Sequence, residues 1–76
     1  MREWDTFIVT FNGIAYEVKA SSFRHSVFVV IEQYNLNVKV GDKFYGCEKK
    51  MLAFGNQSEL PLSDKNMEFI RIKQNI

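Results

Sequence analysis

Residues 4–20 read WDTFIVTFNGIAYEVKA, in which an Asn-Gly pair separates two runs of alternating apolar and polar residues. Asn-Gly between such runs is typical of a β-hairpin with a two-residue turn, and the turn fixes which residues face each other. The pairs expected on one face are Phe11 with Ile14, Val9 with Tyr16, and Phe7 with Val18. All of these side chains are apolar, so the rest of the chain must cover this face of the hairpin.

Length and composition indicate one small globular domain, residues 1–76. Folding at this length buries only about 60% of the surface of the unfolded chain. Hydrophobic residues make up 46% of the chain and aromatic residues 14%, which is enough for a compact core and argues against disorder. The net charge of +1 excludes the broad field of one sign that bulk attraction to nucleic acid or anionic lipid requires.

Cysteine usage and hydropathy favour a cytoplasmic protein. Cys47 is the only cysteine, so no disulfide can form within the chain, whereas small secreted domains usually depend on disulfides. The longest apolar run, residues 27–31, is far shorter than the roughly 20 residues of a membrane-spanning helix. The N-terminal sequence also lacks the basic-then-apolar pattern of a signal peptide. We therefore expect no membrane association.

The segment after the hairpin predicts an amphipathic helix over residues 22–35. Ser22 is a good N-cap, and apolar residues follow at helical spacing: Phe23, Val27, Val30, Ile31 and Tyr34. A buried strand is the competing interpretation, because residues 27–31 are all β-branched or aromatic. In that case the chain is all-β and forms a small barrel of a kind that often binds nucleic acid.

The remainder of the chain predicts mainly extended segments. In chain order these are a short strand or extended connection at 36–40, strands at 43–47 and 50–54, a loop at 57–66 with one helical turn at 62–65, and a closing strand at 67–74. The predicted fold is α+β, with one helix on a mixed sheet of four or five strands. The simplest closure places the last strand beside the first, because the chain must return across the helix, and this arrangement is a β-grasp.

Two short sequence segments resemble ubiquitin and its small bacterial relatives. The order of elements, a hairpin followed by a helix, resembles them as well. Residues 51–55, MLAFG, are similar to the third strand of ubiquitin, and residues 62–66, LSDKN, are similar to the turn before its last strand. The resemblance implies a β-grasp fold and a protein partner, and it places Leu52 at the apolar contact position of the ubiquitin sheet. Residues 73–76 are KQNI, without Gly-Gly, so the resemblance gives no support for conjugation or sulfur-carrier chemistry.

No pattern of catalytic or cofactor-binding residues is present. His25 and Cys47 are the only residues of their types, which excludes a metal site with three such ligands. We expect His25 to be a solvated helix residue and Cys47 a semi-buried strand residue. The glycines form no phosphate-binding motif, and no acidic residues are paired for acid-base work. The expectation is no enzyme activity, no cofactor, no metal and no small-molecule substrate.

Two candidate contact surfaces are expected, the first implied by the ubiquitin resemblance and the second indicated by the residues themselves. Ile8, on the more polar face of the hairpin, combines with Leu52 and Phe54 into an apolar contact for a protein partner. The second surface is a basic stretch with aromatic rings between its lysines, as single-stranded nucleic-acid binders have, and consists of Lys43, Phe44, Tyr45, Lys49 and Lys50. The sequence therefore predicts a non-enzymatic protein-interaction module, such as an accessory or inhibitor subunit. The alternative is a small nucleic-acid-binding domain.

Overall fold

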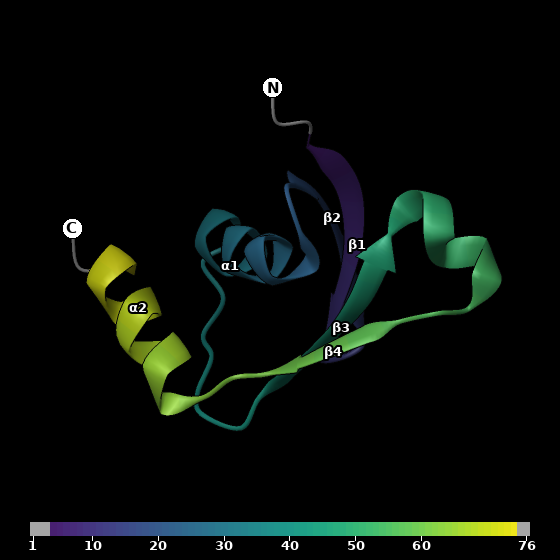
Figure 1. The fold of residues 1–76 in the computed structure, drawn as a ribbon. Helices are drawn as coiled ribbons and strands as arrows, with labels where there is room; N and C mark the ends of the chain where they lie inside the picture. The colour runs from purple at the N-terminus through teal and green to yellow at the C-terminus, as the bar shows by residue number, and fades with distance from the viewer. Residues whose placement is uncertain (1–3, 75–76) are drawn as a thin grey trace.

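The computed structural model describes residues 4–74 of the chain. Figure 1 shows an open β-sheet with helix α1 against one face and helix α2 beside α1, on the side away from the sheet. The elements in order are β1 (Asp5–Phe11), β2 (Ile14–Ala20), α1 (Phe23–Gln33), β3 (Lys43–Glu48), the 3-10 helix η1 (Lys49–Phe54), β4 (Ser58–Pro61) and α2 (Asp64–Gln74).

The hairpin has the predicted register. Phe11 pairs with Ile14, and the remaining pairs follow in step along β1 and β2. Val9 and Val18 are buried beneath α1, whereas Ile14, next to the turn, is 55% exposed. The prediction that the hairpin has one apolar face is therefore confirmed, although this face is not covered as far as the turn.

The helix after the hairpin is confirmed as well. Ser22 is its N-cap, and the Ser22 hydroxyl accepts a hydrogen bond from the backbone N–H of His25 at 3.1 Å. Val27, Val30 and Ile31 are buried against the sheet. The all-β barrel alternative is therefore wrong.

The sheet contains four strands in the order β2-β1-β3-β4, and every neighbouring pair is antiparallel. It is therefore not the mixed sheet that the sequence predicted. The position beside β1 that the closing strand was expected to take is occupied by β3. The fold is a small α+β domain, and the β-grasp arrangement is not confirmed.

The predicted strand at 67–74 is wrong, because this segment belongs to α2. Ser63 and Asn66 cap the start of α2: the backbone N–H of Asn66 donates to Ser63 Oγ, and the backbone N–H of Ser63 donates to Asn66 Oδ1. Met67 and Ile70, three positions apart, are buried on one side of α2. The segment LSDKN therefore contains the start of a helix, which begins at Asp64 and extends well beyond the single helical turn predicted at 62–65.

Two further predictions between β3 and α2 are wrong. Residues 50–54 form η1 instead of a strand, because the pairing of β3 with β1 ends at Phe7 and Glu48 and leaves the chain no neighbouring strand. Gly55, with a positive φ of 75°, then ends η1. Residues 58–61 lie inside the predicted loop but form β4, which pairs with β3. Pro61 is compatible with β4 because β4 lies at the edge of the sheet.

Residues 36–39 form no strand, so the extended connection is the correct interpretation of that segment. Within residues 4–74, no helix combines the length and the apolar character needed to cross a membrane.

Candidate functional site

The structure removes one residue from the predicted contact surfaces. Phe44 is fully buried, and its ring stacks on the ring of Phe11 with centroids 4.4 Å apart and an interplanar angle of 9°. The register explains this position, since Gly46 pairs with buried Val9 and Phe44 lies on the same face of β3 as Gly46. Phe44 is therefore a core residue, and the prediction that it contacts a partner is wrong.

The lysines of the predicted basic stretch are each close to a carboxylate. The Nζ–O distances are 3.5 Å from Lys43 to Glu59, 3.5 Å from Lys49 to Glu17, 3.2 Å from Lys50 to Glu48 and 3.9 Å from Lys50 to Asp5. These pairs are solvent-exposed for the most part, so they add little to stability. They do balance the positive charge of the stretch, which weakens the case for a cationic surface.

The predicted apolar residues lie around η1. Leu52 is 45% exposed and Phe54 is 70% exposed, and Met51 beside them is 38% exposed. We call these three residues the η1 surface. In Figure 1, η1 is the coil that follows the arrowhead of β3, and it lies on the side of the sheet opposite α1. The ion pair of Lys49 with Glu17 agrees with this, because Glu17 alternates along β2 with the core residue Val18.

Ile8 and Tyr45 are on the same side of the sheet as η1. Ile8 pairs with Cys47, and both residues alternate along their strands with residues of the core face. Ile8 is half-buried and Cys47 is buried, with η1 packed against β1 and β3. Tyr45 is 40% exposed. The structure thus brings Ile8, Leu52 and Phe54 to one side of the sheet, and the η1 surface is its most exposed apolar part.

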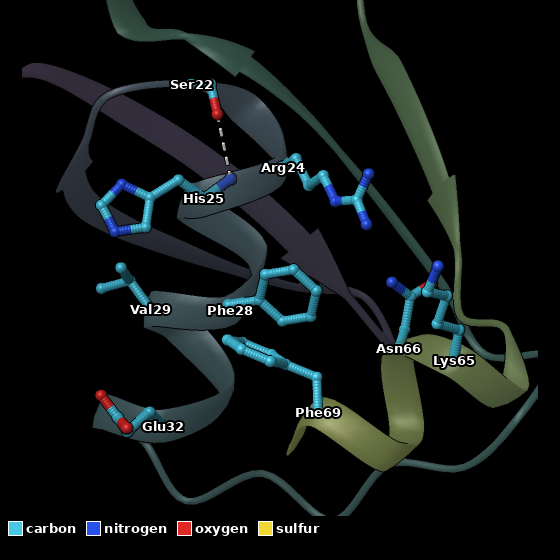
Figure 2. A pocket seen from close by; sticks show the side chains of 9 residues that line it. All are labelled: Ser22, Arg24, His25, Phe28, Val29, Glu32, Lys65, Asn66 and Phe69. Carbon is cyan, nitrogen blue, oxygen red and sulfur yellow. Dashed lines mark hydrogen bonds between the residues drawn. The ribbon is translucent and has the colours of Figure 1, made fainter. Parts of the chain in front are cut away.

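A groove that was not predicted from the sequence lies between α1 and α2 (Figure 2). The groove has a volume of about 460 Å³. At its centre the rings of Phe28 and Phe69 meet edge to face, with centroids 5.3 Å apart. The groove depends on α2, which was predicted as a strand. The Ser-x-x-Asn spacing of Ser63 and Asn66, followed by apolar residues three apart, was the available signal for the helix.

Cations and one carboxylate flank the aromatic pair. Arg24 and Lys65 line the groove with Asn66, and Glu32 lines it one helical turn beyond Phe28. Neither Arg24 nor Lys65 forms an ion pair with any residue in the described part of the chain. In this respect the two groove cations differ from the paired lysines on the other side of the sheet.

His25 also lines the groove, but its surroundings are those of a structural residue. Its Nδ1 lies 3.1 Å from the backbone nitrogen of Ser21, which donates to it, and the Trp4 ring meets the imidazole edge to face at 5.2 Å. No hydrogen bond joins His25 and Cys47. Across residues 4–74, no group of three potential metal-ligating side chains is found.

Comparison of the chain with protein-family models, with curated proteins and with solved structures gave no significant match in any of the three.

Proposed function

We propose that this chain is a non-enzymatic protein-interaction module that binds its partner through the η1 surface. The observation that carries the proposal is the exposure of Met51, Leu52 and Phe54 within one short helix. Single exposed apolar residues are normal on a protein surface, whereas neighbouring ones mark contact sites. Phe54 is the expected anchor, because it is the most exposed of the three and aromatic residues are enriched at the centres of interfaces.

The charges around the η1 surface favour a protein partner over nucleic acid. Lys49 and Lys50 are paired with carboxylates, so the rim of the surface carries charges of both signs. Protein interfaces typically combine an apolar centre with such a polar rim. Nucleic-acid binding needs unbalanced positive charge and exposed stacking rings, and burial of Phe44 removes one of the predicted rings. Nucleic-acid binding is therefore the weaker candidate.

Three features agree with the ubiquitin resemblance and support this proposal: the hairpin, the helix packed across it and the exposure of Leu52. The helical end of the chain weighs against a complete β-grasp. An accessory or inhibitor subunit that covers part of a larger protein fits these features. Such a role needs only an exposed contact surface and no catalytic group.

Replacing Phe54 with aspartate should reduce partner binding at least about tenfold, because a carboxylate would be desolvated where an aromatic anchor is expected. The partner is first isolated by affinity capture from native cells and identified by mass spectrometry. Its dissociation constant is then measured by calorimetry against the wild-type chain and the variant. Circular dichroism should show an unchanged fold, because the Phe54 side chain is mostly solvated.

Val40→Asp is the matched control, since Val40 is 49% exposed but lies in the connection between α1 and β3. It should bind like the wild type. Equal affinity of the wild type and Phe54→Asp, or an equal loss in both variants, would rule out the η1 surface as the contact.

A further inference from the structure

The side chain of Asn66 leaves one hydrogen-bond donor open to the groove between α1 and α2. Asn66 is 8% exposed, and its Oδ1 accepts hydrogen bonds from the Ser63 backbone N–H at 3.0 Å and from the Ser63 hydroxyl at 2.9 Å. Because a backbone N–H can only donate, this contact fixes which end of the amide is oxygen. Nδ2 is then left as a donor, and it has no partner among the residues that the structure describes.

Figure 2 shows the amide nitrogen of Asn66 directed toward the side of the groove from which Arg24 extends, with Lys65 beside it. Arg24 and Lys65 are also donors, and both lack an ion pair within the described residues. One end of the groove therefore presents a guanidinium, an ammonium and an amide N–H. This combination is complementary to an anion.

The charge of the groove limits the charge of that anion. Arg24 and Lys65 are opposed by Glu32 at the other end, so the groove has an excess of one positive charge when His25 is neutral. A monoanion such as a carboxylate balances this excess. A phosphate monoester, with about −1.5 to −2 charges at pH 7, would exceed it.

The rest of the groove is apolar and of the size of a small-molecule site. Phe28, Val29 and Phe69 line it next to the donors, and its volume of about 460 Å³ lies within the range of roughly 300–1,000 Å³ that ligand pockets span. Because the Phe28 and Phe69 rings already contact each other, a ligand would lie on this pair and not between the rings.

We propose that the groove between α1 and α2 binds a small monocarboxylate with an apolar ring. Its carboxylate accepts hydrogen bonds from Arg24, Lys65 and Asn66, and its ring lies on Phe28 and Phe69. This inference departs from the sequence-based expectation of no small-molecule ligand, and it is independent of the η1 surface on the other side of the sheet.

Titration of the ¹⁵N-labelled chain with naphthalene-2-carboxylate, followed by NMR, tests this site. The carboxylate should shift the amide signals of Arg24, Phe28, Asn66 and Phe69 in a saturable manner. Naphthalene-2-carboxamide, which has the same ring without the charge, should bind about tenfold more weakly, because charge-assisted hydrogen bonds are lost. Arg24→Gln should weaken carboxylate binding by a similar factor, since Arg24 is exposed and its loss should leave the fold intact.

Lys39→Gln is the charge-matched control, because Lys39 is exposed in the connection before β3 and does not line the groove. It should bind naphthalene-2-carboxylate like the wild type. Absence of saturable shifts at the groove, equal affinity for the carboxamide, or an equal loss in Lys39→Gln would overturn the proposal. So would groove signals that move with protein concentration alone, since a second copy of the chain would then occupy the groove.

Discussion

Replacing Gly46 with alanine is expected to remove most of the folding free energy of this domain. Gly46 lies in the middle of β3, opposite Val9. A Cβ atom there would overlap the carbonyl oxygen of Ile8 and would approach Phe23 Cε1 to 3.1 Å. The Ile8 carbonyl belongs to the backbone of the neighbouring strand, so it cannot move without separating β1 from β3.

Overpacking of this kind typically costs 1–3 kcal/mol, and a clash with backbone belongs at or above the upper end, at about 3 kcal/mol. Domains of this size have only about 3–5 kcal/mol of stability. Urea unfolding monitored by circular dichroism measures the loss, and the melting temperature should fall by roughly 12 °C or more.

Gly13→Ala is the informative comparison for Gly46→Ala. Gly13 has a positive φ of 79°, but a Cβ at Gly13 would meet no atom within 4 Å. Its replacement should cost only the backbone strain of about 1–2 kcal/mol. If Gly46→Ala destabilises the domain no more than Gly13→Ala does, the close approach of β1 to Gly46 is contradicted.

The second large effect is expected for Phe44→Ala. The Phe44 side chain is fully buried and stacks on Phe11, so its truncation leaves a cavity at the centre of the core. Such changes cost about 3–5 kcal/mol, which again approaches the whole stability of a small domain. Urea unfolding of the variant provides the measurement.

Tyr45→Ala serves as the neighbouring control, because Tyr45 is 40% exposed and faces away from α1. Its cost should be clearly below that of Phe44→Ala. Similar losses at the two positions would mean that the two faces of β3 have been assigned incorrectly.

Phe44 and Tyr45 are neighbours in the sequence, but only Phe44 faces the core, and this difference was not predictable from the sequence. The hairpin was predictable to the residue, because Asn12-Gly13 sets the register locally. The face of β3 that points to the core depends on its pairing with β1, which is distant in the sequence. The residues around Phe44 therefore predicted the strand correctly, but they gave Phe44 the wrong role, a partner contact instead of a core position.

The prediction of a strand at residues 67–74 was wrong for a different reason. The β-branched and aromatic residues of 67–74 favour a strand by propensity, but packing against α1 and the Ser63–Asn66 cap decide for a helix. The groove between α1 and α2 could not be predicted without that helix. The residues of the η1 surface, by contrast, are neighbours in one short segment. Leu52 and Phe54 were named as contact candidates from the sequence, and both are exposed in the structure.

The position of α2 has a consequence for the dynamics of the domain. Among the described elements, α2 packs against α1 only, whereas α1 also packs against β1, β2, β3 and β4. Detachment of α2 therefore requires less free energy than global unfolding, and the backbone amides of α2 should exchange with deuterium faster than those of α1. Any molecule held between the two helices would slow this exchange, so deuterium uptake by α2 reports occupancy of the groove without a mutation.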